Sequence, residues 1–151
     1  MADPLWVSQL AADLIHTHLS PGWTFRFDSA KTRAGLCNHS TQTISLSRYL
    51  ASRYLEDDTR QVLLHEIAHA LAGAGAGHGP RWKSIATELG YTGRRLHDGE
   101  IAHELAPWLG ACPAGHAHYR YRRPARALSC GTCARRFDSA NAITWTQRTV
   151  R

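Results

Sequence analysis

The sequence lacks the features that mark a membrane protein or a secreted protein held together by disulfides. No apolar run approaches the length of about 20 residues that a transmembrane helix needs. The N-terminal residues 1–6 show no basic segment followed by an apolar stretch, as a secretory signal would. Only four cysteines are present. We therefore expect a soluble, cytoplasmic and monomeric protein with reduced thiols and no membrane partner.

Acidic residues are scarce near the C-terminus, although the chain as a whole is close to balanced. Residues 112–151 contain eight arginines and one acidic residue, a net charge of +7, whereas residues 1–111 contain ten basic and eleven acidic residues. The formal charge of +6 thus comes from the C-terminal part. A length of 151 residues suits one compact domain with a small basic appendage.

A pair of histidines one helical turn apart is the most informative motif. The run His65-Glu66-Ile67-Ala68-His69 places two imidazoles on the same face of a helix, where both can grip one metal ion. Catalytic zinc sites combine three protein ligands with a water molecule whose pKa the metal lowers towards neutrality. Glu66 follows His65 directly and is the candidate general base for that water. The pattern predicts a zinc hydrolase site.

The residues around the motif favour a helix of about four turns. Asp57 and Asp58 are acidic N-terminal cap candidates, and Gly73 is a natural stop. Between them, apolar residues recur at helical spacing: Val62, Leu64, Ile67, Ala68 and Leu71. The motif is therefore expected in the middle of an amphipathic helix.

The third metal ligand has two candidates. A metzincin pattern is excluded because its third histidine would fall at Gly75. His78 follows an alanine- and glycine-rich stretch over residues 72–77 that lets the chain turn back, and it precedes Pro80, which suits the first turn of a new helix. Glu88 is the alternative, as a downstream helical carboxylate. We favour His78 on spacing and on the ligand preference of zinc.

These motifs carry a resemblance to a known family. Leu64-His65-Glu66-Ile67-Ala68-His69-Ala70, followed by Gly77-His78-Gly79-Pro80-Arg81-Trp82, resembles the SprT-like zinc metallopeptidases, whose eukaryotic relative is the protease Spartan. The resemblance spans the chain from about Trp23 onwards and is most specific in the catalytic motif. It implies that His65, His69 and His78 bind zinc and that Glu66 is catalytic.

The helices and strands expected along the chain give the fold class, and the resemblance implies the ribbon and the substrate class. The expected fold class is α+β: a zincin-like minimal metalloprotease core over residues 1–110, with helices around a small antiparallel sheet, and a basic β zinc ribbon over residues 111–151. The family implies cleavage of proteins bound or crosslinked to DNA, with DNA directing or activating the reaction. Two other functions stay open: a general peptidase without a nucleic-acid role, and a non-catalytic zinc-dependent DNA-binding module.

A second, structural zinc site is expected in the ribbon. Cys130-Gly131-Thr132-Cys133 forms one metal-binding knuckle, and a tetrahedral site needs two more soft or imidazole ligands. Cys112 supplies one of them. The sequence departs from the paired cysteines usual in the family, so a histidine must be the other; we choose His116, with His118 as the alternative. The competing interpretation is a metal-free pair of reduced cysteines.

Arginines alternate with aromatic residues in the ribbon. Tyr119 to Arg126 and Arg135-Arg136-Phe137 combine guanidinium groups, which pair with phosphates, with rings on which exposed bases stack. DNA is therefore an expected partner beside the protein substrate, although Tyr119 and Tyr121 also fit one packed face of a strand. The expected contacts are Arg120, Arg122, Arg123, Arg126, Arg135 and Arg136.

The remaining segments are interpreted as scaffold. A helix begins at Asp3 and Pro4 and ends at Ser20. Strands are expected over residues 23–27, 33–37 and 42–46, a short helix over 48–55, a helix over 80–89 and a connecting segment over 93–110. A sheet beside the active helix would offer an edge on which an extended substrate pairs. We interpret Cys37 as a buried free thiol, and His39 and Tyr91 as packing or surface residues.

Overall fold

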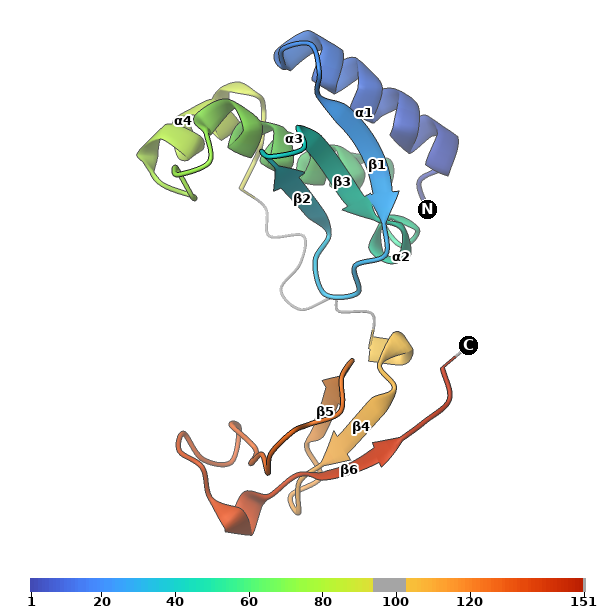
Figure 1. Ribbon diagram of the computed structural model, residues 1–151, viewed down its shortest axis with the longest axis vertical. Helices are drawn as coiled ribbons and strands as arrows, with labels where there is room; N and C mark the ends of the chain where they lie inside the picture. Colours follow the sequence, from blue (N-terminus) through green and yellow to red (C-terminus); the bar gives the residue numbers. More distant parts are fainter. Residues whose placement is uncertain (94–102, 151) are drawn as a thin grey trace. The chain divides into compact units, whose positions relative to one another are not determined.

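The computed structural model describes residues 1–93 and 103–150 (Figure 1). The chain divides into two compact units, residues 1–101 and 102–151. Within the described residues, the strand Trp108–Ala111 pairs with two strands that follow it and belongs to the second unit. The division therefore falls before residue 110, where we expected the boundary. Residues 94–102 of the expected connecting segment lie outside the described residues.

The first unit has four helices and a three-stranded sheet in its described part. The elements are α1 (Pro4–His18), β1 (Thr24–Asp28), β2 (Gly35–Asn38), β3 (Thr43–Ser47), α2 (Arg48–Ala51), α3 (Glu56–Ala72) and α4 (Pro80–Glu88). In the second unit the elements are the short 3-10 helices η1 (His103–Leu105) and η2 (Ser139–Asn141) and the strands β4 (Trp108–Ala111), β5 (Ala117–Arg120) and β6 (Thr144–Gln147). Helices around small sheets confirm the α+β fold class.

Helix α1 begins where the sequence predicts it. The Asp3 carboxylate accepts hydrogen bonds from the backbone N–H groups of Leu5 and Trp6, at 2.8 and 3.1 Å. Pro4 occupies the first helical position, where no N–H is needed. Val7, Ala11 and Ile15, each one turn apart, form its buried stripe.

The sheet of the first unit is mixed, whereas we expected an antiparallel sheet. The strand order is β1-β3-β2; β2 and β3 are antiparallel, but β1 runs parallel to β3. A short turn joins β2 to β3 as an antiparallel hairpin. Strand β1 pairs with the other side of β3 and runs in the same direction as β3. Four consecutive residues of β3, from Ile44 to Ser47, are buried, as expected for a central strand.

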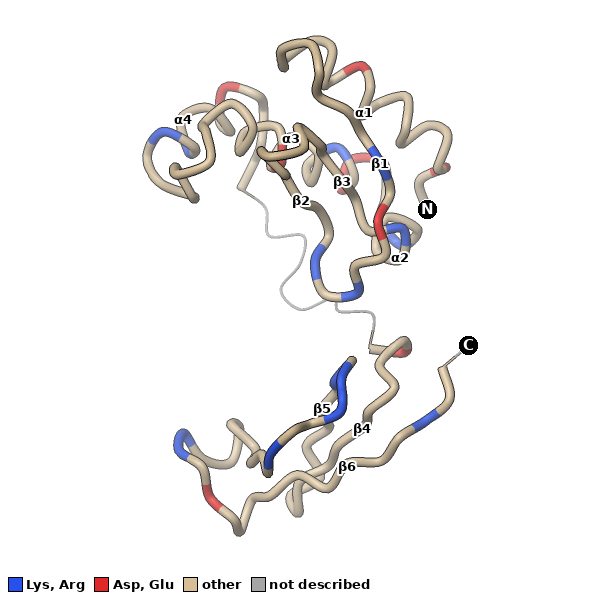
Figure 2. Tube along the Cα trace, viewed as in Figure 1, with Lys and Arg blue, Asp and Glu red and all other residues tan. Residues whose placement is uncertain are grey.

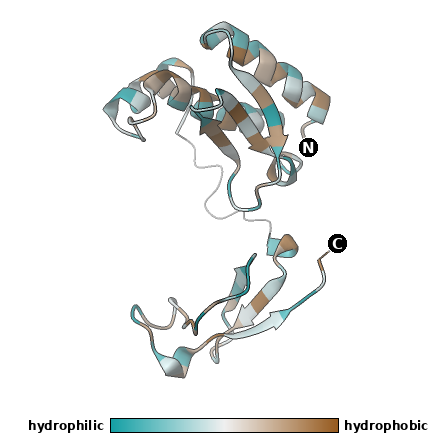
Figure 3. Ribbon diagram, viewed as in Figure 1, coloured by the Kyte–Doolittle hydropathy of each residue, from teal (hydrophilic) through white to brown (hydrophobic). Residues whose placement is uncertain are grey.

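Helix α3 is the core element of the first unit. It contacts α1, α4, β2 and β3, and nine of its residues are buried. Figure 3 shows hydrophobic residues concentrated on the sheet and on the helices around it. The N-cap residue of α3 is Leu55, whose side chain makes no capping hydrogen bond. The prediction that Asp57 or Asp58 caps this helix is therefore wrong. These two acids lie in the first turn, where they complement the helix dipole.

The other helix boundaries follow local signals. Helix α2 spans only Arg48–Ala51, shorter than the expected 48–55, and the Ser47 hydroxyl caps it by accepting from the N–H of Leu50 at 3.2 Å. Helix α3 ends at Gly73, as predicted, with φ at 97°. Helix α4 begins at Pro80 and ends one residue earlier than expected, at Glu88.

The second unit is built on an antiparallel sheet in the order β5-β4-β6. Gly110 allows β4 to lie against the ring of Trp145, because an added Cβ would stand 2.8 Å from it. Arg148 donates from Nε to the backbone oxygen of Ala106 at 2.8 Å and ties the segment after β6 to the start of the unit. Within the described residues, no helix has the length and apolarity to cross a membrane.

Candidate metal centres

Helix α3 and the loop after it bring three histidines together. His65 and His69 lie one turn apart on α3, with their Nε2 atoms 3.2 Å apart. The Nε2 atom of His78 lies 3.0 Å from that of His69 and 3.1 Å from that of His65. Zn–N bonds of about 2.0–2.1 Å place two ligand nitrogens of one ion roughly 3.3 Å apart. Three converging imidazole nitrogens at this spacing fit a zinc ion.

The loop over residues 73–79 folds His78 back onto the helix. Gly73 and Gly77 have φ of 97° and 50°, values that glycine adopts more easily than other residues. The turns close through hydrogen bonds of 3.1 Å from the N–H of Ala76 to the oxygen of Gly73 and from the N–H of Gly79 to the oxygen of Ala76. His78 thus completes the cluster; Glu88, the alternative ligand, is not part of it.

Burial and neighbouring charge keep one of the ligands neutral. The pKa of His69 lies below its ordinary value because the ring is desolvated and because the charges of His78 and His39 oppose protonation. Neutral imidazole is the form that binds a metal. His65 and His69 are half-buried and His78 is exposed, so one side of the cluster faces solvent.

Trp82 of α4 packs against the whole cluster. Its ring centroid lies 4.7, 5.3 and 4.6 Å from those of His65, His69 and His78. Its indole N–H donates to the backbone oxygen of His65 at 3.4 Å. The family motif includes Trp82, but nothing in the sequence indicates that its ring contacts the candidate ligands. The buried indole restricts the ligand rings to the orientations that converge.

Tyr91 lies against the same cluster from the segment after α4. Its ring is 5.4 Å from that of His65 and 5.7 Å from that of Trp82. The buried side chain of Gln61 holds the segment in place, since its oxygen accepts from the N–H of Thr92 at 2.9 Å. Tyr91, which we interpreted as a packing or surface residue, thus packs on a metal-ligand candidate.

Glu66 points from α3 towards strand β2. It is 8% exposed, and an ideal Cβ at Gly35 would stand 2.8 Å from its Cγ and Oε1 atoms. Burial raises the pKa of Glu66 to about 7, against the opposing effects of the Arg33 charge and the backbone N–H of Cys37. A carboxyl group that titrates near neutrality can accept a proton and return it.

Residues of strand β2 lie near Glu66, although the sequence indicated no role for them. Cys37 is half-buried rather than fully buried, and its Sγ lies 3.7 Å from Nε2 of His39. Burial and the charge of Glu66 raise the pKa of this thiol to about 11, so it stays protonated. No sequence signal marks Gly35, because its importance is the absence of a side chain next to Glu66.

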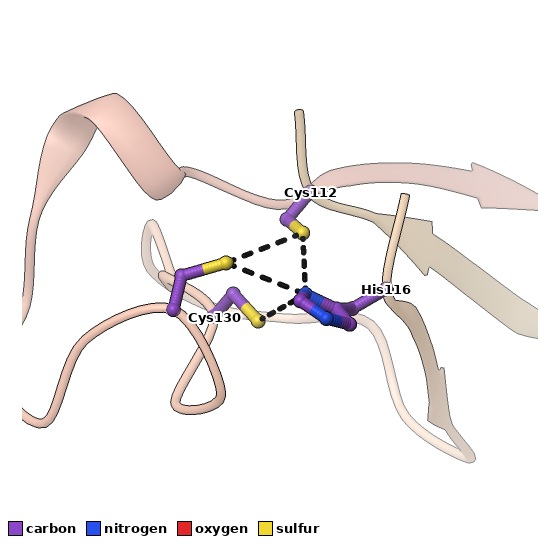
Figure 4. A group of neighbouring side chains, drawn as sticks. Cys112, His116 and Cys130 are labelled. Carbon is purple, nitrogen blue, oxygen red and sulfur yellow. Dashed lines mark hydrogen bonds between the residues drawn. The ribbon is translucent and has the colours of Figure 1, made fainter. Parts of the chain in front are cut away.

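The ribbon holds a second ligand cluster, formed by Cys112, His116, Cys130 and Cys133. Nδ1 of His116 lies 3.4, 3.6 and 3.3 Å from the Sγ atoms of Cys112, Cys130 and Cys133. Figure 4 shows the labelled side chains converging on one point. Zn–S and Zn–N bonds of about 2.3 and 2.0 Å put sulfur and nitrogen roughly 3.5 Å apart. Three thiols and one imidazole fit a structural zinc ion.

His118, the alternative to His116, lies outside this cluster. Its side chain hydrogen-bonds to Cys130, and its Nε2 atom is buried without a hydrogen-bond partner among the described residues. Burial alone would raise the pKa of Cys130, but the N–H groups of Cys133 and Thr132, the Cys133 thiol and the His118 side chain lower it. The surroundings of Cys130 thus favour the thiolate that a metal requires.

The structure gathers some of the expected DNA-contacting arginines, not all. Arg126, Arg135 and Arg136 line a hollow of about 600 Å³ together with Phe137, which is 63% exposed. The guanidinium of Arg123 lies elsewhere, 6.0 Å from the ring of Trp108. Figure 2 shows basic residues at the end of β5, which is Arg120, and in the loops of the second unit. Arg122 lies two residues after this strand.

A comparison with protein families gives one result: the model of the SprT-like family matches residues 6–106, more than half of the chain. The matched range includes the three histidines and Glu66 but stops before the ribbon. Neither the curated proteins nor the solved structures contain a significant match.

Proposed function

Because this chain belongs to the SprT-like family and its first unit is a metallopeptidase-like domain, we propose that it is a zinc-dependent endopeptidase acting on DNA-bound or DNA-crosslinked proteins, with Glu66 as general base. One observation carries the proposal. Three imidazole nitrogens from α3 and the following loop converge within 3.2 Å of one another, and Glu66 follows the first of them directly.

The ligand set suits one catalytic ion. When bound by His65, His69 and His78, zinc would polarise the scissile carbonyl and acidify a water molecule. Glu66 takes a proton from the attacking water and later delivers it to the leaving amide nitrogen, so that no proton is gained or lost overall. A metal-binding module with a purely structural role would have no use for that carboxylate, which favours catalysis over the DNA-binding module.

The ribbon supports a second ion and a nucleic-acid contact. Cys112, His116, Cys130 and Cys133 would hold a structural zinc that anchors the loops on which the arginines are placed. The hollow lined by three of these arginines offers phosphate-pairing groups around the exposed ring of Phe137. An exposed base stacks on such a ring without regard to its identity, so we propose binding that does not depend on DNA sequence.

The proposal is tested with zinc-loaded protein and a DNA-binding protein as substrate. Cleavage is followed on a gel with no DNA, single-stranded DNA or double-stranded DNA. Glu66→Gln should abolish cleavage while keeping zinc, and Glu88→Gln, which changes an exposed acid outside the cluster, should leave it intact.

The outcomes separate the three candidate functions. Cleavage by the unaltered protein that DNA enhances supports the proposed enzyme. Cleavage that is indifferent to DNA, without salt-sensitive DNA binding, indicates a general peptidase. Tight DNA binding with both clusters metal-loaded and no cleavage in any condition indicates a DNA-binding module and contradicts the proposal.

A further inference from the structure

A second surface lies between α1 and β1. Figure 1 shows α1 beside β1. A groove of about 770 Å³ there is lined by residues of both elements. Most of its walls are apolar: Ala12, Ile15, Leu19, Trp23, Phe25 and Phe27. We propose that this groove binds an extended segment of a partner protein, which adds to the sheet as a fourth strand and carries an acidic residue opposite Arg26.

The groove follows an open edge of the sheet. Five consecutive residues, Trp23 to Phe27, line it; a cavity over one face of a strand would touch alternate residues only. In the part of the chain that the structure describes, β1 pairs with β3 on one side and with no strand on the other. An extended segment can therefore approach the outer edge of β1 within the groove.

The register shows which backbone groups are available there. The N–H of Thr24 donates to the oxygen of Gln42 at 3.0 Å, so Thr24 faces β3. Hydrogen-bonding directions alternate along a parallel strand, which turns the N–H and C=O groups of Phe25 and Phe27 outwards. These groups are the hydrogen-bonding positions that a fourth strand would fill.

An extended segment of a partner protein suits this groove better than an acyl chain or a second copy of β1. An acyl chain would fill the apolar walls but leave the backbone groups of Phe25 and Phe27 without partners, which is costly once water is excluded. A second copy of β1, paired antiparallel about a two-fold at Phe27, would place Arg26 opposite Asp28, whose carboxylate already pairs with Arg33 at 2.8 Å. About a two-fold at Arg26, it would place Arg26 opposite Arg26. Like charges directly opposite each other destabilise a strand pair.

Charge indicates the chemistry of the segment. Arg26 is exposed between the two phenylalanines, and His16 of α1 is exposed on the opposite wall. Among the described residues that line the groove, none is acidic. An acidic side chain directly across from Arg26 would pair with it, while apolar side chains on either side of that residue would face the apolar wall.

The groove is separate from the candidate catalytic centre. The strand order places β1 and β2 at opposite edges of the sheet, and β2 is the strand whose Gly35 meets Glu66. Binding in the groove therefore needs neither Glu66 nor a bound metal. It can be tested independently of the proposed protease activity.

The test uses a fluorescein-labelled heptapeptide in which valine and threonine alternate around a central glutamate, and the same peptide with a central lysine. Binding to the full chain is measured by fluorescence anisotropy in a Glu66→Gln background, which prevents cleavage of the probe. Hydrogen exchange of the backbone amides locates the site. We expect the glutamate peptide to bind about three- to five-fold more tightly than the lysine peptide and to protect the amides of Phe25 and Phe27.

Two variants make the result specific to the groove. Arg26→Glu should reverse the preference between the peptides, whereas Arg60→Glu, the same charge change at an exposed site on α3, should not. Ala12→Arg should block the groove and abolish binding of both peptides, and circular dichroism verifies that its helix is retained. The proposal is overturned if neither peptide binds, if Ala12→Arg leaves binding unchanged, or if protection of these two amides accompanies dimerisation of the chain alone.

Discussion

Glu66 lies so close to the backbone of Gly35 that a Cβ added there would stand 2.8 Å from its Oε1 atom and 2.8 Å from its Cγ atom. The contact joins the central helix to the edge strand β2. It limits where the buried carboxylate can lie. The position of the proposed general base therefore depends on Gly35, a residue without a side chain.

Gly35→Ala should therefore reduce kcat and change KM much less. The new methyl group must displace Glu66 or separate β2 from α3, which costs about 1–3 kcal/mol in a packed site. A misplaced general base accounts for a decrease in kcat of the order of 10²-fold. Peptidase kinetics and zinc content measure the effect, and zinc should remain bound. Gly75→Ala is the matched control, because no described atom lies within 4 Å of a Cβ there; equal activity of the two variants would disprove the role of Gly35.

His78→Ala should remove the metal of the first unit only. Two imidazoles bind zinc more weakly than three, whereas the ribbon cluster is untouched, so roughly half of the bound zinc should be removed by dialysis. Metal analysis by mass spectrometry measures the decrease. His16→Ala, at an exposed position of α1, should retain all of it. Full zinc occupancy in His78→Ala would argue that another residue completes the site.

His116→Ala and His118→Ala should differ in the ribbon. His116 belongs to the ligand cluster, so its removal should release the structural metal and unfold the ribbon. His118 contacts Cys130 from outside the cluster, and removal of such a partner weakens metal affinity by about 10–100-fold without abolishing binding. Competition with a chromogenic chelator compares the two variants. The reverse order of zinc affinities would make His118 the ligand.

Asp28→Asn should reduce stability at neutral pH but progressively less in acid. Burial opposes ionisation of Asp28, but hydrogen bonds from Ser45, Ala30 and Arg33 outweigh it and lower the pKa below 3.8. A group with a lowered pKa stabilises the folded state above its unfolded pKa, and that contribution disappears as the pH falls through the folded pKa. Near neutrality we expect a decrease in the free energy of unfolding of about 1–3 kcal/mol.

Urea unfolding of Asp28→Asn and the unaltered protein at several pH values between 7 and 3 measures this difference. Asp13→Asn is the control, because Asp13 is exposed and its carboxylate accepts a hydrogen bond from the exposed side chain of Gln9. A stability difference that is constant over the whole pH range would show that the Asp28 charge is not responsible.

Replacing Arg135 and Arg136 by alanine should weaken DNA binding and its salt dependence together. Removing one arginine that pairs with a phosphate lowers the slope of log K against log salt by about one unit. Binding titrations at several salt concentrations test this, with Arg60→Ala as the control in the first unit. An unchanged slope would place the DNA-binding surface elsewhere on the ribbon.

The candidate metal ligands can be predicted from the sequence because their spacing depends on local geometry. A spacing of four residues puts His65 and His69 on one helix face whatever surrounds the helix, and the glycines before His78 allow a tight return. The same holds for Cys130 and Cys133, which lie close together along the chain. Helix starts at Pro4 and Pro80 were equally local, since proline at the first helical position needs no N–H.

Strand direction and long-range contacts were not readable in this way. The sequence of a short strand does not indicate which strand it pairs with or in which direction, so the parallel pairing of β1 with β3 could not be predicted. The choice between His116 and His118 also depended on folding. His116 directly precedes β5 and His118 lies within it, and only the paired strands decide which ring faces the cysteines.

Taken by itself, the sequence determined the candidate ligands of the first cluster, the α+β class and the basic character of the ribbon, because helical periodicity, residue chemistry and net charge are properties of short segments. Only the tertiary structure decided the surroundings of those ligands: Trp82 against the imidazoles, Gly35 against Glu66, and an open edge on β1. These contacts join residues far apart in the chain, and their geometry exists only once the helices and the sheet have packed.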